Sequence, residues 1–404
     1  MHGETILCID NRVWHSLWRD SQQIMSRMAS DNKVYYVEHG RDPDRPHSAE
    51  VLRNWPNLFA LRPQRYTDNL TIIPTPPCLP YARRHLPSPI LRFSTPLVAR
   101  VNSLILIRHV RWAMREFAIE RPILWLYEPR HIDLVGKFGE KLVCYFNYDE
   151  MSDFAANARM RALLREYDNR LTRCADVVFT TSRGQWERRV RLNPHTYLTP
   201  NGVDFDLFNT ALRPETEIPK DVVSIPRPII GFAGWIGSQV DVDLLVHLAD
   251  VCKDCSLVLV GPDCLPAGER LRQLRARRNV FFLGQKPVTS LPGYLKAFDV
   301  ALIPYVIGGH TLTVYPLKLH EYLAAGTAIV ATALPELGAF GEVVRIADDY
   351  DGFVRYVRTA IDDYSPEVVA ARVAVARANT WDRRVADIYR VLEKALNGSL
   401  REGS

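Results

Sequence analysis

The sequence has no long apolar run, few cysteines and little net charge. Its 404 residues contain no stretch of eighteen apolar residues, so we expect no segment to span a membrane. A strand-like run at residues 5–9 follows the initiator Met so closely that we expect no signal peptide. The apolar fraction of 47% and the charged fraction of 24% exclude a disordered, collagen-like or coiled-coil chain. We therefore expect a cytoplasmic protein of two or three domains.

The seven cysteines are scattered and odd in number, which is a poor disulfide framework and fits a reducing compartment. Four residues could supply zinc ligands, namely His247, Cys252, Cys255 and Cys264. Their spacing fits no standard zinc module. We interpret these cysteines as buried thiols and predict no metal site.

The net charge of +5 is unevenly distributed along the chain. Residues 1–200 hold 29 basic and 21 acidic side chains, whereas residues 201–404 hold 22 and 25. The excess is densest at residues 79–121, where eight arginines alternate with apolar side chains and the only acids are Glu116 and Glu120. Such a segment suits the surface of an anionic bilayer. A solvated helix face is nearly as good an interpretation, and nucleic acid is a weaker one.

Short apolar runs alternate with helical patterns, which predicts an α/β fold. In the first half we expect strands at residues 5–9, 34–37, 70–73, 123–127, 142–146 and 177–180. In the second half we expect strands at 229–233, 256–260, 280–283, 300–304 and 328–332, with helices at 241–251, 268–277, 291–298 and 316–325. Parallel neighbours need right-handed helical crossovers, so each half predicts a doubly wound parallel sheet.

A proline-rich stretch separates the two halves. It has little periodicity, so we interpret residues 201–228 as a linker. The predicted domains are then an N-terminal Rossmann-like domain at 1–200 and a C-terminal Rossmann-like domain at 229–381. We expect the two to face each other across a cleft at the carboxyl ends of their strands, where such sheets bind ligands.

The most specific motif runs from Thr313 to Gly326. Pro316 suits the first helical position, and a helix start offers N–H groups and a positive dipole end to an anion. Lys318 adds a cation there, and Glu321 offers a carboxylate to the hydroxyls of a ribose. A solvated salt bridge between Lys318 and Glu321 explains the pattern equally well.

Two loops after predicted strands carry further candidates. Gly231, Gly234 and Gly237 would let the backbone approach a phosphate, although glycine-rich turns are common. The other loop, residues 148–153, is acidic, and Glu128 follows a neighbouring strand. Its acids could bind sugar hydroxyls or act as a base, or they could only cap the next helix.

Together these segments resemble bacterial GT-B glycosyltransferases of the large retaining class, in particular those of teichuronic acid and exopolysaccharide synthesis. The matching segments are residues 148–153, 200–204, 231–237, 299–305 and 316–326, together with Trp381. The resemblance extends over nearly the whole chain and is strongest from residue 178 to residue 336.

The resemblance implies a nucleoside-diphosphate sugar in the C-terminal domain and an acceptor in the N-terminal domain. It also implies that the final helix, residues 382–398, returns to the first domain. Glu321 matches the family's ribose-binding glutamate, and the backbone at Leu317 and Lys318 matches its diphosphate cradle. Thr313 stands where the family has the first glutamate of a pair, so recognition of the donor sugar must differ.

The resemblance leaves two other positions open. The basic residues that neutralise the diphosphate in the family are not evident at 235–243, and we expect Lys318 and Arg12 to replace them. Tyr148 or Asp149 stands approximately at the position where the family often has a histidine.

The sequence thus predicts a retaining glycosyltransferase that needs no metal or other cofactor and uses a UDP- or GDP-type donor. We expect a glycan or lipid-linked acceptor, an anionic membrane surface bound through 79–121, and no nucleic acid. The predicted catalytic residues are Asp149, Lys318 and Glu321, and the predicted donor-binding residues are Gly234, Gly237, Thr313, Pro316, Leu317, Lys318 and Glu321. The alternatives are a binding protein of this fold that transfers nothing and, less favoured, a nucleotide-sugar epimerase.

Overall fold

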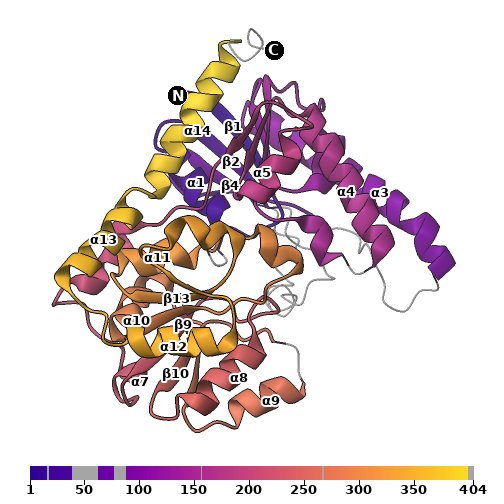
Figure 1. Cartoon of the computed structure of the whole chain (residues 1–404). Coiled ribbons are helices and arrows are strands. Elements are labelled where there is room, and N and C mark those ends of the chain that lie inside the picture. The colour runs from indigo at the N-terminus through magenta and orange to yellow at the C-terminus, as the bar shows by residue number, and fades with distance from the viewer. Residues whose placement is uncertain (16–17, 39–61, 77–87, 156, 266–267, 399–404) are drawn as a thin grey trace. The chain divides into compact units, whose positions relative to one another are not determined.

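The chain divides into two compact units. The computed structural model describes residues 1–15, 18–38, 62–76, 88–155, 157–265 and 268–398 (Figure 1). Unit 1 comprises Met1–Thr199 and Val385–Ser404, and unit 2 comprises Pro200–Arg384. The part of the predicted basic segment at residues 79–87 lies outside the described residues.

Unit 1 is built on a sheet of order β3-β4-β2-β1-β5-β6-β7-β8, in which only the β3–β4 pair is antiparallel. Its strands are β1 (Thr5–Asp10), β2 (Lys33–Glu38), β3 (Gln64–Arg65), β4 (Leu70–Pro74), β5 (Ile123–Leu126), β6 (Leu142–Asn147), β7 (Val177–Thr180) and β8 (Thr196–Leu198). The central strands are almost wholly buried, as is typical of a parallel sheet covered by helices on both faces.

Helices join most of these strands. They are α1 (Asp20–Met28), α3 (Ser88–Glu116), η2 (Pro129–Leu134), η3 (Met151–Phe154), α4 (Ala158–Cys174) and α5 (Arg183–Arg189). Most of the final helix, α14 (Trp381–Leu396), belongs to unit 1 from Val385 onwards. There the Tyr389 hydroxyl accepts a hydrogen bond from Asn32 Nδ2 at 2.9 Å and donates one to the Met28 carbonyl at 3.3 Å.

Unit 2 is built on a parallel sheet of order β11-β10-β9-β12-β13-β14. Its strands are β9 (Ile229–Ala233), β10 (Ser256–Val260), β11 (Val280–Gly284), β12 (Val300–Ile303), β13 (Ala328–Thr332) and β14 (Arg345–Ala347). Its helices are α6 (Phe205–Phe208), η4 (Asn209–Leu212), α7 (Lys220–Val223), α8 (Val242–Val251), α9 (Glu269–Arg275), η5 (Val288–Ser290), α10 (Leu291–Ala297), η6 (Gly309–Thr313), α11 (Lys318–Ala324), η7 (Pro335–Phe340), α12 (Tyr350–Ala360) and α13 (Pro366–Arg377).

The structure confirms the α/β prediction and corrects two details. Residues 201–228 are not a linker, because their apolar side chains, such as Val203 and Val222, are buried in the core of unit 2. Asn209 Nδ2 also ties this segment to the Ala324 carbonyl at the end of α11, at 2.9 Å. The helix predicted to begin at Pro316 begins at Lys318, with Leu317 as its N-terminal flanking residue.

Each sheet has a point at which the strand order reverses. In unit 1 the chain runs outward from β1 to β2 and β4 and then places β5 on the other side of β1. In unit 2 it runs from β9 to β10 and β11 and then places β12 on the other side of β9. Open α/β sheets bind ligands at the carboxyl ends of the strands at such a point. This rule selects the loops after β1 and β5 in unit 1 and after β9 and β12 in unit 2.

Candidate functional site

The loop after β9 leaves room for a side chain from α11. Gly234 has a φ of +147°, which strongly favours glycine, and its N–H donates to the Val260 carbonyl at 2.7 Å. Gly261, after β10, has a φ of +145°, and a Cβ there would overlap the Gly234 carbonyl. A Cβ on Gly234 would overlap the Lys318 side chain. Glycine at 234 therefore allows Lys318 to lie directly over the end of β9.

The loops after β9 and β12 are tied to each other by backbone hydrogen bonds. The Asp241 N–H donates to the Pro304 carbonyl at 2.8 Å, and the Val306 N–H donates to the Gln239 carbonyl at 2.9 Å. Helix α11 is fixed to β9 as well, because the Tyr322 hydroxyl contacts both the N–H and the carbonyl of Ala233, at 2.9 and 3.1 Å. The switch-point loops and α11 thus form one rigid frame.

Lys318 is a buried cation in this frame. The residue is only 8% exposed, and its Nζ lies 5.1 Å from the ring centre of Phe232 and 5.8 Å from that of Tyr305. Among the described residues, none forms a hydrogen bond or an ion pair with this ammonium group. Partial burial weakens the hydration of this charge, and the two aromatic rings compensate the loss only in part. The arrangement favours an anionic ligand beside Lys318.

Glu321 lies one turn after Lys318 on α11. Burial raises the pKa of its carboxyl to about 7, and the positive charge of Lys318 opposes this rise. The described part of the chain shows no ion pair between the two side chains, and Lys318 is buried, so the solvated salt bridge considered above is not what forms. Glu321 therefore presents a carboxyl without a hydrogen-bond donor among the described residues, beside a cation that also lacks a partner there.

The raised pKa of Glu321 predicts a pH-dependent stability. Between pH 4.5 and about 7 the folded state holds a proton on Glu321 that the unfolded state has released, so the free energy of unfolding falls as the pH rises through this window. Glu321→Gln removes this fall. We expect its Tm relative to wild type to increase from pH 4.5 to pH 7 and to level off above, as measured by thermal unfolding without ligand. Glu342→Gln, at an exposed position of the same unit, is the matched control; a variant whose relative Tm does not change with pH would contradict the prediction.

The other predicted donor-site residues lie on the approach to α11, except Gly237, which lies in the loop after β9. Thr313 ends η6, and its Oγ1 donates to the His310 carbonyl at 3.2 Å. The Pro316 carbonyl accepts from the Leu319 N–H at 3.2 Å, so Pro316 and Leu317 form the turn that starts the helix. The first N–H groups of any helix have no acceptor within the helix. Gly237 lies against the indole of Trp235, where a Cβ would overlap the ring.

Sequence reasoning missed three residues that hold this approach in place. The Tyr315 hydroxyl and His320 Nε2 are 2.7 Å apart and buried, and Asn201 Nδ2 donates to the Tyr315 carbonyl at 2.8 Å. Burial lowers the pKa of His320 to about 3, so its ring is neutral. No spacing in the sequence links Asn201 to a turn more than a hundred residues later, although Asn201 belongs to a segment that the resemblance had identified.

In unit 1 Asp149 lies in the loop after β6, the strand next to β5, and thus beside the two loops that the switch-point rule selects. Burial raises the pKa of Asp149 to about 6, and the guanidinium groups of Arg12 and Arg19 oppose the rise. Arg12 lies 3.8 Å from the ring centre of Tyr148, and its Nη1 donates to Asp20 Oδ1 at 2.7 Å. Arg12, which the sequence suggested as a cation for a diphosphate, is thus engaged within unit 1, beside Asp149.

The loop that carries Asp149 is held on both sides of that residue. Asn147 Nδ2 donates to the Asp149 carbonyl at 3.1 Å, and Thr181 Oγ1 donates to the Tyr148 carbonyl at 2.9 Å. Helix α4 is capped by Asn157, whose side chain accepts from the Met160 N–H, so the acids at 149–153 are not caps of that helix. Their other predicted role, contact with a ligand, stays a prediction for Asp149.

Glu150 and Glu128, in contrast, bind protein groups. Glu150 accepts from Ser152 Oγ at 2.7 Å and pairs with Arg188 and Arg189. Glu128 accepts from Asn11 Nδ2 at 2.6 Å and pairs with Arg130 at 3.0 Å. Both carboxylates therefore help to hold the edge of the sheet.

Several buried polar atoms at this edge of unit 1 have no hydrogen-bond partner within the described residues. They are Asp10 Oδ1, Asp20 Oδ2, Tyr127 OH and Asn147 Oδ1. Buried polar atoms are normally paired with protein or water, so a group of them at the switch point indicates room for water or a hydroxyl-rich ligand. In the part of the chain that the structure describes, no cluster of three or more His, Cys, Asp or Glu residues is arranged to hold a metal ion.

One family of known sequences matches a segment within unit 2. Residues 227–364 match the family described as Glycosyl transferases group 1. TuaH of Bacillus subtilis (strain 168), named as a teichuronic acid biosynthesis glycosyltransferase, is 31% identical over 136 residues, which are 33% of this chain and 34% of TuaH. WcaI of Escherichia coli (strain K12), named as a colanic acid biosynthesis glycosyl transferase, is 25% identical over 231 residues, or 54% of each chain. The chain thus matches about a third and about half of the length of these relatives.

Solved structures resemble the chain over almost its whole length. Sucrose-phosphate synthase from Thermosynechococcus elongatus has a TM-score of 0.70 at 15% identity, over 98% of this chain and all of that one. Anabaena Alr3699/HepE, solved in complex with UDP and glucose, has a TM-score of 0.62 at 14% identity, over 97% of this chain and all of that one. At such identities the likeness establishes the fold alone, which is the GT-B fold.

Proposed function

We propose, from the premise that residues 227–364 form a glycosyl transferases group 1 domain in a chain of GT-B fold, that this protein transfers a sugar in the synthesis of a cell-surface polysaccharide. The relatives named for teichuronic acid and colanic acid synthesis support the polysaccharide. The donor is a nucleoside-diphosphate sugar bound in unit 2. The acceptor is a hydroxyl of a glycan or lipid-linked glycan bound in unit 1.

The observation that carries the donor assignment is Lys318 beside Gly234, a largely buried residue whose ammonium group pairs with no described residue. A diphosphate supplies the missing negative charge, and Gly234 leaves the room in which Lys318 lies beside it. The turn at Pro316 and Leu317 adds helix-start N–H groups for the same phosphates. Glu321 then accepts hydrogen bonds from the ribose hydroxyls, which compensate its carboxylate and lower its pKa on binding.

The reaction exchanges one bond for another at the anomeric carbon of the donor sugar. The bond from this carbon to the diphosphate oxygen breaks, and a bond to the acceptor oxygen forms, with retention of configuration. Lys318 and the helix-start N–H groups stabilise the charge on the leaving diphosphate, and no metal is required for this. The proton of the acceptor hydroxyl leaves with the phosphate oxygen or with water.

Asp149 is the residue we assign to the acceptor. Its carboxylate orients an acceptor hydroxyl, so activity is expected to rise as the pH increases through about 6, where Asp149 ionises. Asp149→Asn should lower kcat by about 100-fold or more and remove this pH step, without changing nucleotide affinity. Asp153→Asn, four residues along the same acidic segment, is the matched control. Equal activity of Asp149→Asn and wild type would refute this role.

A thermal-shift screen of UDP-, GDP- and dTDP-sugars tests the donor assignment. A ligand that binds only the folded protein raises Tm, so one nucleotide series is expected to stabilise the chain strongly. Glu321→Ala should abolish the shift for that series, whereas Glu342→Ala should retain it. The absence of a shift with all three nucleotides would argue against a nucleotide-sugar site.

A second candidate is a binding protein that holds a nucleotide-sugar without transferring it. Thr313 favours this alternative, because a threonine cannot supply the carboxylate that the resembling family has there. Release of free nucleotide from the donor distinguishes the two functions. Slow release that Glu321→Ala abolishes supports the enzyme, and tight binding without turnover supports the binding protein.

The proposal also places the protein at the inner face of the cell membrane, through the described part of the basic segment. Helix α3 has exposed arginines and exposed apolar side chains, as a bilayer surface requires. Among the described helices, none is long and apolar enough to cross a membrane. Flotation with anionic vesicles at low salt tests this location, and failure to float would remove it.

A further inference from the structure

Helix α3 presents one face to solvent from Leu97 onwards. Leu97 and Leu104 on this face are 63% and 60% exposed, and Trp112 is 37% exposed. Four exposed arginines lie on the same face at helical spacing, and they are Arg100, Arg108, Arg111 and Arg115. Large aliphatic side chains at such exposure indicate a binding surface when they form a continuous stripe.

The opposite face of α3 fixes the helix to unit 1. Leu106, Val110 and Ala113 are buried in the core, and the ring of His109 is hydrogen bonded to the Pro74 carbonyl at 2.9 Å. The exposed stripe, which consists of Leu97, Leu104, Trp112 and the four arginines, is therefore a fixed surface of the unit. Its arginines cannot all turn inward.

The stripe carries positive charge without compensation. Residues 88–115 contain no Asp or Glu. Arg100, Arg108 and Arg115 form no ion pair with any described residue, and the guanidinium of Arg111 bonds a backbone carbonyl instead. Its Nε and Nη2 donate to the Lys137 carbonyl at 3.2 and 3.1 Å.

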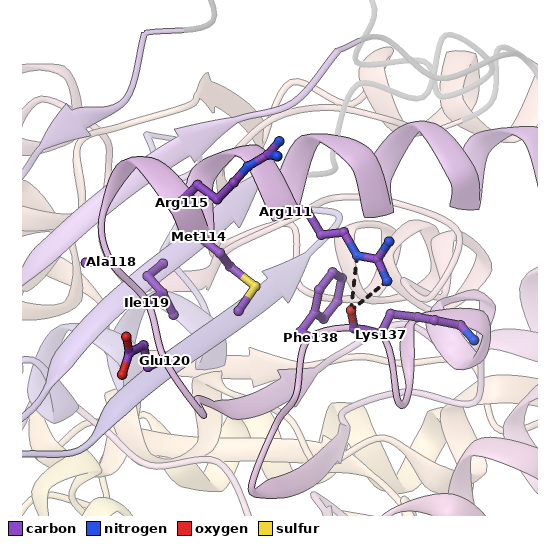
Figure 2. A pocket seen from close by; sticks show the side chains of 8 residues that line it. All are labelled: Arg111, Met114, Arg115, Ala118, Ile119, Glu120, Lys137 and Phe138. Atoms are coloured by element: carbon purple, nitrogen blue, oxygen red, sulfur yellow. Dashed lines mark hydrogen bonds between the residues drawn. The ribbon is translucent and has the colours of Figure 1, made fainter.

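A pocket of about 540 Å³ opens where α3 ends (Figure 2). It is lined by side chains from the last turn of α3, the turn that follows and the loop at 137–138, namely Arg111, Met114, Arg115, Ala118, Ile119, Glu120, Lys137 and Phe138. Ile119 and Phe138 are buried and give the pocket an apolar base. Arg115 and Lys137 are exposed cations at its rim, and Glu120 lies at the other end from Lys137 (Figure 2).

We propose that this pocket binds the head group of one anionic glycerophospholipid, which extends the membrane location proposed above and rests on it. The lipid phosphate binds at the cationic rim to which Arg115 and Lys137 belong, with Arg111 between them (Figure 2). Glu120 accepts hydrogen bonds from head-group hydroxyls, such as those of a glycerol. The first carbons of the acyl chains contact Met114 and Phe138, and Leu104 and Trp112 enter the bilayer beside the bound lipid.

Lipid fits this surface better than nucleic acid does. A nucleic-acid phosphate backbone needs positive charge along its length and gains nothing from exposed leucines. Here Leu97 and Leu104 alternate with the arginines, and the carboxylate of Glu120 would repel a continuous polyanion. The apolar base of the pocket is complementary only to a ligand with a hydrocarbon part.

The test compares two double variants that remove the same charge. Arg115→Gln with Lys137→Gln changes the pocket, and Arg100→Gln with Arg108→Gln changes the stripe outside it. The first probe is monomeric dihexanoyl phosphatidylglycerol, below its micellar concentration, titrated by calorimetry against the full-length protein. We expect saturable binding that the pocket variant weakens at least tenfold and the stripe variant weakens less than twofold. Dihexanoyl phosphatidylcholine and inorganic phosphate should bind at least tenfold more weakly than phosphatidylglycerol.

The second probe is a vesicle that contains phosphatidylglycerol. Both variants should float less well, by a similar factor, because each exposed basic residue contributes about equally to attraction by an anionic surface. Equal weakening of both variants toward the monomeric lipid would overturn the pocket and leave the membrane location intact. Competition by a single-stranded RNA oligonucleotide at equal affinity would also overturn it. Failure of donor binding in the nucleotide screen would refute the transferase and not the pocket, so the two failures are distinguishable.

Discussion

Replacing Lys318 by methionine is expected to lower kcat by about 100- to 1,000-fold and to weaken binding of the nucleoside diphosphate. Loss of one preorganised group that stabilises a developing negative charge typically has an effect of this size on the rate. Methionine keeps most of the volume of the buried stem, and the packing over Gly234 should survive. The measurements are steady-state kinetics with the preferred donor and calorimetric titration with its free diphosphate.

The same variant distinguishes a functional cation from a structural one. Because the ammonium group pairs with no described residue, its removal should change Tm little. Lys253→Met, at an exposed position of the same unit, is the control and should behave like wild type in every assay. Wild-type turnover and nucleotide affinity in Lys318→Met would contradict both the assignment of the residue and the donor site built around it.

Replacing Arg189 by methionine is expected to destabilise the protein by about 3–5 kcal/mol, the usual cost of removing one partner from a buried ion pair. Arg189 is wholly buried, its Nη2 lies 2.9 Å from both oxygens of Asp168, and it also contacts Glu150 at 3.4 Å. The Tyr145 hydroxyl bonds Asp168 at 2.6 Å. The variant would leave Asp168 as a buried carboxylate whose one remaining cationic contact among the described residues is Arg188 Nη2, at 3.5 Å. Chemical unfolding of the unliganded protein gives the free energy directly.

Two further variants test whether the loss of stability comes from the ion pair. Arg188→Gln changes a half-exposed arginine on the same helix and should cost about 1 kcal/mol or less. Arg189→Met combined with Asp168→Asn should recover about 1 kcal/mol or more relative to the single variant, because the uncompensated carboxylate is gone. If the double variant were less stable than the single one, the cost would come from packing and not from charge.

The alternation of strands and helices could be predicted from the sequence because each parallel strand is a short apolar run buried on both faces. The runs at 177–180, 229–233, 256–260 and 328–332 coincide with β7, β9, β10 and β13. Short edge strands such as β14 were not found, because three residues carry too little periodicity to detect. The proline-rich segment 201–228 was misread because proline density indicates irregular backbone, and irregular backbone can still be packed in a core.

The residues of the candidate site could be selected from a sequence motif, but their burial and their neighbours could not. Lys318 and Glu321 were selected by their spacing after a proline, and they remained open to interpretation as a solvated pair. Burial changes this interpretation, because it leaves the ammonium group without a partner in the described structure and raises the pKa of the carboxyl to about 7. Arg12 and Asp149, 137 positions apart in sequence, carry no common pattern, and only the sheet order of unit 1 brings the ends of β1 and β6 to the same edge.

The sequence by itself determined the α/β class, the two sheets and the positions of the loops that bear the polar residues. These features follow from local periodicity, since a buried strand or helix face is encoded by apolar residues close together in the sequence. Only the tertiary structure decided which charges are paired and which are not. Arg188 and Arg189 pair with Glu150, whereas the sequence shows only that Glu150 and Asp149 lie in one acidic loop. The sequence predicted Lys318 as a catalytic cation, and the structure adds that it lies over Gly234 without a described partner. The electrostatic environment of a charged group depends on its burial and on partners distant in the sequence. For this reason only the tertiary structure shows it.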